Sequence, residues 1–267
     1  MSRITVERRD NGVVHVVLSH PERRNAIDWE MLSGLAKTSR SLRKDRDLRV
    51  VVLRGEGPSF CSGLDFPRFT KTPARLLQGF VTLPTRKANV FQDACWGWRA
   101  LPVPVISVLH GHCFGGGMQI ALASDFRLTT PDCQLSVMEA KWGLIPDMSG
   151  TLALRELVGM DQAKLLTMTG RILDGRQAKE IGLVTGVYDD PLAEAETLVA
   201  ELLTRSPDSI AAGKALLQAN WVDTEGSALA RERRVQMMVI AGANFREAMR
   251  ANFKKVAPSF GRRSPLV

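Results

Sequence analysis

Two glycine-rich segments carry the most visible chemistry in this chain. Residues 57–66 read GPSFCSGLDF, a turn dense in small residues, where the N–H groups near Gly63 and Leu64 can point outward without a partner. Residues 111–125 read GHCFGGGMQIALASD, in which three glycines let the backbone approach a ligand and the following helix presents its first N–H groups. One donor from each segment would form an oxyanion hole for a thioester or acyl oxygen. Taken singly, each segment also fits an ordinary tight turn.

Two carboxylic acids follow the second segment. Glu139 has apolar neighbours, and loss of water raises the pKa of a carboxyl toward neutrality, which suits it to proton transfer. Asp147 follows Pro146, which interrupts any continuous helix, so the chain must turn back to bring the two acids together. Asp147 fits either a second proton-transfer group or the N-cap of the next helix. Asp65, in the first glycine-rich segment, fits either a ligand contact or a turn cap.

The composition is that of a globular protein. The chain has 267 residues, of which 45% are hydrophobic and 24% charged, and this excludes disorder, collagen-like repeats and a coiled coil as the main state. The net charge of +8 is spread along the chain beside no recognisable nucleic-acid-binding motif, so nucleic acid is not the favoured partner. We find no membrane anchor, no secretory signal and no CxxC pair, and expect reduced thiols in a cytoplasmic protein. His110 and His112 lack a third ligand nearby, so no metal site is expected.

Alternating strand and helix patterns surround these segments and predict an α/β core. Strands are expected at 3–9, 13–18, 50–53, 103–109, 126–128 and 134–137, and helices at 28–43, 87–100, 118–123, 148–158, 161–168, 175–181, 191–204, 207–219 and 224–255. Residues 67–85 are rich in Pro and Thr and predict a mobile loop. We therefore divide the chain into a core with the site, 1–200, and a C-terminal helical oligomerisation region, 201–267.

Five motifs in this order resemble the crotonase superfamily, the enoyl-CoA hydratase/isomerase family. The resemblance covers about residues 3–260, and it is specific only when the motifs are taken together. They are RRNA at 23–26, FCSGLD at 60–65, PVPVISVLHG at 102–111, GGGMQ at 115–119 and MEAKWGLIPDMSGT at 138–151.

The resemblance implies a spiral of ββα units with a C-terminal helical region that forms homotrimers or hexamers. It implies acyl-CoA thioester substrates of fatty acid metabolism, with Leu64 and Gly116 donating the oxyanion-hole N–H groups. It also implies a slot for CoA near RRNA, with Lys255 approaching the CoA phosphates. On this basis we assign nine residues to substrate and CoA binding: Arg24, Asn25, Ala26, Ser62, Gly63, Asp65, Phe66, Gly115 and Lys255.

The acids decide the expected reaction. The resemblance implies two glutamates in hydratases, but Gln119 occupies the first position and an amide cannot exchange a proton as a carboxylic acid does. Glu139 fills the second position, and the pair of Glu139 and Asp147 is similar to that of dienoyl-CoA isomerases, where two acids move a proton between the ends of a dienoyl chain. Isomerisation is therefore expected ahead of hydration, with Gln119 orienting a water or the acyl chain.

This chemistry needs no metal or redox cofactor, because CoA arrives as part of the substrate. Two alternatives stay open: a catalytically poor acyl-CoA-binding protein, and an RNA-binding member of the family.

Overall fold

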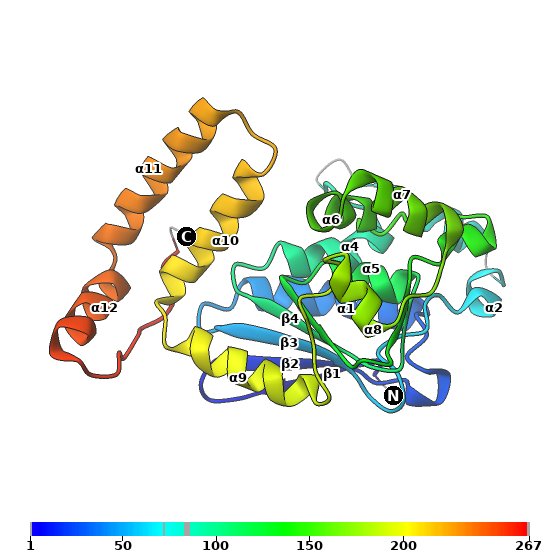
Figure 1. Cartoon of the computed structure of the whole chain (residues 1–267), viewed down its shortest axis with the longest axis horizontal. Helices are drawn as coiled ribbons and strands as arrows, with labels where there is room; N and C mark the ends of the chain where they lie inside the picture. Colours follow the sequence, from blue (N-terminus) through cyan, green and yellow to red (C-terminus); the bar gives the residue numbers. More distant parts are fainter. Residues whose placement is uncertain (1, 72, 83–85, 266–267) are drawn as a thin grey trace.

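The computed structural model describes residues 2–71, 73–82 and 86–265 (Figure 1). Its strands are β1 (Ile4–Arg8), β2 (Val13–Leu18), β3 (Val50–Gly55), β4 (Val105–Leu109), β5 (His112–Phe114), β6 (Phe126–Thr129), β7 (Gln134–Ser136) and β8 (Gly186–Val187). Its helices are η1 (Pro21–Arg23), α1 (Trp29–Arg43), α2 (Phe66–Phe69), α3 (Pro73–Gly79), α4 (Val90–Arg99), α5 (Gly116–Leu122), η2 (Glu139–Trp142), α6 (Gly150–Leu157), α7 (Met160–Thr169), α8 (Gly175–Glu180), α9 (Pro191–Leu203), α10 (Pro207–Asn220), α11 (Glu225–Ala241) and α12 (Ala243–Lys254).

A six-stranded sheet in the order β1-β2-β3-β4-β6-β8 forms the centre of the molecule. Only the β1–β2 pair is antiparallel, as the hairpin around Gly12 predicts, and the other pairs are parallel. Strands β5 and β7 form a second, parallel pair. Parallel strands are covered on both faces, which is why β2, β3 and β4 are almost continuously apolar.

Helices cover both faces of the large sheet. Val14 and Val51 point into the main core with residues of α1, α4 and α5, whereas Val13 and Val50 pack against α9. Figure 1 shows α9 below the sheet and the other three helices above it. The alternation of side chains along each strand produces this division, because successive residues face opposite sides.

Helix α1 begins as the sequence predicts. The Asp28 side chain accepts a hydrogen bond from the N–H of Met31 at 2.9 Å and so caps the helix. The same carboxylate also pairs with Arg68 at 2.6 Å. Asp28 therefore ties α1 to α2, close to the first glycine-rich segment.

The C-terminal helices α10, α11 and α12 extend away from the sheet (Figure 1). They pack on one another, and α11 buries none of its residues. The tail returns to the core, where the N–H of Arg263 donates to the carbonyl of Arg46 at 3.1 Å. No helix in the described part of the chain is both long and apolar enough to cross a membrane.

The structure corrects two of the predicted elements and adds two short strands. Residues 67–85 do not form one loop but contain α2 and α3, whose prolines stand in the first turn, where the missing N–H costs nothing. The single helix predicted over 224–255 is broken at Gly242 into α11 and α12. The short strands β5 and β8 were not predicted at all, because two or three residues give no visible periodicity. Part of the predicted loop, 72 and 83–85, lies outside the described residues.

Candidate active site

Backbone hydrogen bonds hold the two glycine-rich segments side by side. The N–H of Cys61 donates to the carbonyl of His112 at 2.9 Å, and the N–H of Phe114 donates to the carbonyl of Cys61 at 3.0 Å. A side chain at Gly117 would begin 2.6 Å from the Cβ of Cys61, so only glycine permits this approach. The fold thus brings 57–66 and 111–125 together, as their proposed chemistry requires.

The N–H groups of Leu64 and Gly116 are left available at this junction. Ile27 bonds to the residues on either side of Leu64, accepting from the N–H of Asp65 and donating to the carbonyl of Gly63. Gly116 is the first residue of α5, where an N–H has no acceptor within the helix. Among the described residues, no group accepts a hydrogen bond from either amide. A Cβ on Gly116 would lie 3.8 Å from the Cγ of Leu64, so the two residues are neighbours.

Glu139 stands beside these amides. It begins η2 and is 7% exposed. Its Oε1 lies 3.6 Å from the position that a Cβ on Gly115 would occupy, and accepts a hydrogen bond from Nε2 of Gln119 at 2.7 Å. Its Oε2 is buried and has no partner among the described residues. One oxygen of the carboxyl group is therefore fixed and the other is available for proton transfer.

Asp147 lies near enough to Glu139 for the two charges to interact. Burial raises the pKa of Glu139, and the negative charge of Asp147 raises it further, against the hydrogen bond from Gln119. Burial also raises the pKa of Asp147. Both carboxyls therefore hold their protons to a higher pH than exposed acids, as groups that exchange protons near neutrality do.

Asp147 does not cap α6. The N-cap position belongs to Ser149, so the N-cap alternative for Asp147 is wrong. Asp147 instead lines a cavity of about 300 Å³. The other lining residues come from the segment before α4, from α4 and from the start of α6: Lys87, Ala88, Gln92, Trp96, Pro146, Ser149, Thr151 and Leu152.

Gln119 is held in one orientation by the backbone. Its Oε1 accepts hydrogen bonds from the N–H groups of Met148 at 2.8 Å and Gly150 at 3.0 Å. Because that oxygen faces two donors, the NH₂ group must face Glu139. The sequence assigned Gln119 to orienting a water or the acyl chain, whereas the structure directs its amide to the catalytic candidate. The roles of Met148 and Gly150 could not be found from sequence, because they act through backbone atoms.

The structure gives the residues assigned to the CoA slot different surroundings. Arg24 is exposed, and its carbonyl accepts from the N–H of Ser62 at 3.0 Å, which places RRNA against the first glycine-rich segment. Asn25 is fully buried, and its side chain bonds only to backbone, namely the N–H of His20 and the carbonyls of Glu56 and Ser59. The Asn25 side chain therefore holds this turn in place, and contact between Asn25 and CoA stays a prediction.

Asp65 and Phe66 lie at the start of α2. The Asp65 carboxylate is buried and pairs with Arg23 at 3.1 Å and Arg68 at 3.5 Å, and its side chain does not cap the helix. Phe66 packs against Trp142 with ring centroids 4.6 Å apart. Since 61% of Trp142 is exposed, these two rings form part of the surface around the site.

Lys255 is separated from the other assigned residues. It terminates α12, and Figure 1 shows this helix at the opposite end of the long axis from α2. Within one copy of the chain Lys255 thus lies far from the other assigned residues, and its approach to the CoA phosphates stays a prediction. Its sequence motif gave no distance information, because the connecting helices set its position.

Cys61, His110 and His112, which lie in or beside the glycine-rich segments, make contacts that support the fold. Burial raises the pKa of the Cys61 thiol to about 12, so it stays protonated at neutral pH. Nδ1 of His112 and Oγ of Ser59 share a hydrogen bond of 2.8 Å. Nε2 of His110 forms a hydrogen bond of 2.9 Å with the carbonyl of Gly57. No group of three or more metal-binding side chains occurs within the described residues.

Comparison with known proteins gives one consistent result. A sequence model of the enoyl-CoA hydratase/isomerase family matches residues 8–263. The chain is 30% identical over 216 residues to methylglutaconyl-CoA hydratase, mitochondrial, of Mus musculus, covering 78% of this chain and 67% of that protein. It is 30% identical over 258 residues to enoyl-CoA hydratase domain-containing protein 2, mitochondrial, of Homo sapiens. This match covers 94% of this chain and 86% of that protein. The solved structure of an enoyl-CoA hydratase from Polaromonas sp. JS666 superposes with a TM-score of 0.86 at 26% sequence identity. The superposition covers 97% of this chain and 99% of that chain.

The sheet, the helices around it and the two joined glycine-rich segments thus occur in a chain that matches this family over nearly its whole length. Members of the family act on acyl-CoA thioesters. The chain belongs to the enoyl-CoA hydratase/isomerase family of the crotonase superfamily.

Proposed function

We propose that this enzyme moves double bonds in acyl-CoA thioesters, with Glu139 and Asp147 exchanging the protons. The observation that carries the proposal is the set of acids beside the available amides. Glu139 is buried and Asp147 half-buried, and both have raised pKa values, whereas the third position holds the neutral Gln119. Two separate proton-transfer groups suit a reaction that removes a proton at one carbon and adds one at another.

The proposed steps balance without an oxidant or a reductant. One carboxylate takes a proton from the carbon next to the thioester carbonyl, and the electron pair moves onto the carbonyl oxygen. The N–H groups of Leu64 and Gly116 stabilise that oxyanion. The other carboxyl returns a proton to the far end of the conjugated chain, and the double bonds shift. Each acid ends in the opposite protonation state and is restored before the next turnover.

Substrate binding follows from the same surface. We propose that Arg24, Ala26, Ser62 and Phe66 line the CoA slot, and that Gly63 and Gly115 let the thioester approach the backbone. CoA enters as part of the substrate, and the proton transfers require no metal or redox cofactor. Lys255 reaches a CoA phosphate only from a second copy of the chain, which fits assembly into a trimer or hexamer. The four buried thiols suit the reducing cytoplasm.

Two substrates separate isomerisation from hydration. The purified protein is given a trans-2-enoyl-CoA and a 3,5-dienoyl-CoA separately, and the absorbance of the conjugated thioester is followed. A new extended-conjugation band with the dienoyl substrate is the expected result. Asp147→Asn should reduce that rate by about 10²-fold or more, since it removes one of two proton-transfer groups. Asp189→Asn, at an exposed position after β8, is the matched control and should leave it unchanged.

Other outcomes identify the alternatives. Turnover of the 2-enoyl substrate alone, with Asp147→Asn still active, would make the protein a hydratase and remove Asp147 from the mechanism. Tight binding of acyl-CoA with neither substrate converted would leave a binding protein. A salt-sensitive gel shift with RNA would point to the RNA-binding alternative.

A further inference from the structure

The cavity beside Asp147 lies behind the turn that holds Gln119. It has a volume of about 300 Å³, and its walls come from the segment before α4, from α4 and from the start of α6. The N–H groups of Met148 and Gly150 point to Gln119, and the residue between them, Ser149, lines the cavity. Any part of a substrate that passes Asp147 therefore meets this space.

Ser149 stands at the N-cap of α6 but its side chain does not cap the helix. Its φ of 71° and ψ of 5° are left-handed values, which glycine adopts more readily than serine does. This conformation lets the two neighbouring N–H groups converge on one oxygen, Oε1 of Gln119. A serine at an N-cap usually accepts a bond from the first turn of its helix, but this hydroxyl makes no hydrogen bond to any described residue. The hydroxyl of Ser149 is therefore available in the cavity.

The opposite wall supplies two more hydrogen-bond donors. Oε1 of Gln92 accepts from the N–H of Asn89 at 3.0 Å, so the NH₂ group of Gln92 is left for other partners and has none among the described residues. Lys87, which is exposed, forms no ion pair within the described part of the chain. Asp147 is the one carboxylate among the described lining residues. The unused groups are therefore mainly donors, and an anionic oxygen ligand would satisfy them.

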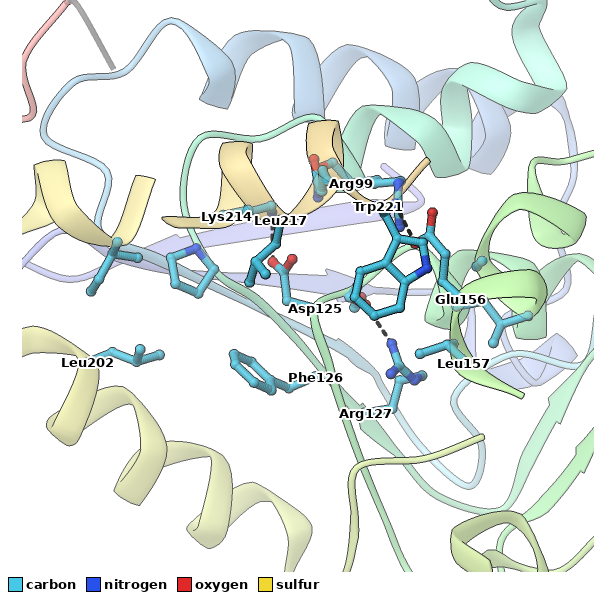
Figure 2. A pocket seen from close by; sticks show the side chains of 16 residues that line it. Arg99, Asp125, Phe126, Arg127, Glu156, Leu157, Leu202, Lys214, Leu217 and Trp221 are labelled. Carbon is cyan, nitrogen blue, oxygen red and sulfur yellow. Dashed lines mark hydrogen bonds and ion pairs between the residues drawn. The ribbon is translucent and has the colours of Figure 1, made fainter. Parts of the chain in front are cut away.

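The larger cavity at the other end of α6 is different. It has a volume of about 400 Å³ and shares no lining residue with the smaller one (Figure 2). Lys214 Nζ lies 2.6 Å from Oδ2 of Asp125, and Arg99 Nη2 lies 2.5 Å from Oε2 of Glu156. Arg127 donates to two backbone carbonyls. The charged side chains of the larger cavity thus already have partners, whereas the smaller cavity has donors without acceptors.

The rest of the smaller cavity is apolar and short. Its apolar walls are Ala88, Trp96, Pro146 and Leu152. Its volume of about 300 Å³ equals that of about ten water molecules at roughly 30 Å³ each. This is the small end of the range for ligand pockets. The space therefore fits a few carbons with one polar group, and not a long fatty acyl chain.

We propose that the substrate is the CoA monothioester of a short unsaturated dicarboxylic acid, whose free carboxylate binds Ser149, Gln92 and Lys87. This substrate class rests on the proposed function, in which the thioester lies at the oxyanion hole and the chain passes Glu139 and Asp147. The free carboxylate then lies in the cavity beyond Asp147. Because a carboxylate accepts hydrogen bonds at both oxygens, it can bind donors from the α4 wall and the α6 wall together.

Binding of two saturated thioesters tests the carboxylate site without turnover. Octanedioyl-CoA, the monothioester with one free carboxylate, and octanoyl-CoA have the same chain length, and titration calorimetry on the full chain gives both dissociation constants. We expect octanedioyl-CoA to bind about tenfold more tightly or better, because hydrogen bonds to a charged group are among the strong ones.

Two variants should reduce this preference by about threefold or more each. Ser149→Gly removes the hydroxyl and keeps the turn, because glycine adopts the left-handed φ readily. Lys87→Met removes the cation at an exposed position. Lys37→Met, at an exposed position of α1 outside the cavity, is the matched control and should keep the wild-type preference.

The outcomes separate this site from the reaction. Equal dissociation constants for the two thioesters, binding of neither, or a preference that survives both variants would overturn the carboxylate site. A preference for octanedioyl-CoA in a protein that isomerises neither octa-3,5-dienoyl-CoA nor its ω-carboxylate would support the site and contradict the proposed reaction. Isomerisation of both dienoyl substrates with equal kcat/KM, and no preference in binding, would keep the reaction and remove the site.

Discussion

The side-chain amide of Gln119 joins the backbone at the start of α6 to the carboxylate of Glu139. Its oxygen accepts from the N–H groups of Met148 and Gly150, and its nitrogen donates to Oε1 of Glu139 at 2.7 Å. This arrangement immobilises one carboxylate oxygen and leaves Oε2 as the group that can exchange a proton. Gln119 thus acts through Glu139 and is a positioning residue in the proposed mechanism.

Replacing Gln119 by glutamate tests this relationship. In Gln119→Glu one new oxygen would accept the two backbone N–H groups, and the other would face Oε1 of Glu139. Two carboxylates at this distance cannot both be ionised, so the pair would share one proton. We expect hydration of a 2-enoyl-CoA to rise at least tenfold and its pH profile to show two ionisations. Gln119→Met, which has neither acid nor amide, is the control; an equal gain there would contradict the explanation.

Glu139→Gln should stop the reaction. Oε2 of Glu139 is buried and has no partner among the described residues, and an amide in its place cannot take a proton. We expect kcat to fall by about 10²–10⁴-fold while the dissociation constant for an acyl-CoA changes little. Stopped-flow absorbance and calorimetry measure the two quantities. A variant that kept more than a tenth of the wild-type kcat would exclude Glu139 as the acid or base.

The raised pKa of Glu139 also affects stability. The folded chain keeps the Glu139 proton to a higher pH than the unfolded chain does, because burial disfavours the carboxylate. The contribution of the protonated Glu139 to the free energy of unfolding is therefore fully present at low pH. It is lost as the pH rises through the raised pKa of this carboxyl. Chemical unfolding of wild type and Glu139→Gln from about pH 4 to about pH 8 measures this. The free energy of unfolding of the wild type minus that of the variant should fall as the pH rises, and a value that stayed constant or rose would refute the assignment.

Asn25 should be a stability residue. Its φ of 55° is unfavourable for most side chains, and its amide satisfies three buried backbone groups. Asn25→Ala removes all three bonds and should lower the free energy of unfolding by about 3 kcal/mol. Asn11→Ala, whose exposed side chain accepts one bond from Val13, should cost less than about 1 kcal/mol. Comparable costs for the two variants in chemical denaturation would refute this role.

The elements that sequence predicted well are those with strong local signals. The Asn-Gly hairpin before Val13 and the Asp28 cap of α1 both lie within a few residues of the pattern that predicts them. Helices α2 and α3 were missed because a proline in the first turn has the same appearance as a proline in a loop. The break at Gly242 was missed because glycine also occurs inside helices.

The site was predictable only in its residue types. The glycine runs and Glu139 carry chemistry that can be identified from their neighbours. The partners of Gln119 are backbone amides 29 and 31 residues away, and nothing in their side chains marks them.

The N–H of Gly116 can be removed without removing its helix. Gly116 is the first residue of α5, a position where proline is well tolerated because that N–H makes no bond within the helix. Gly116→Pro deletes the proposed oxyanion donor, and Gly116→Ala keeps it. Both variants add a Cβ, which would lie 3.0 Å from Cδ1 of Ile27 and 3.1 Å from Sδ of Met148, and proline in addition places a ring carbon where the N–H was.

The ratio of the two variants measures the loss of the N–H together with the ring carbon that replaces it. Loss of one oxyanion donor lowers kcat by about 10²–10³-fold in other enzymes, and we expect Gly116→Pro to be slower than Gly116→Ala by a factor in that range. Equal kcat values for two folded variants would show that the Gly116 amide does not contact the oxyanion, and the proposed mechanism would then lose one of its two donors.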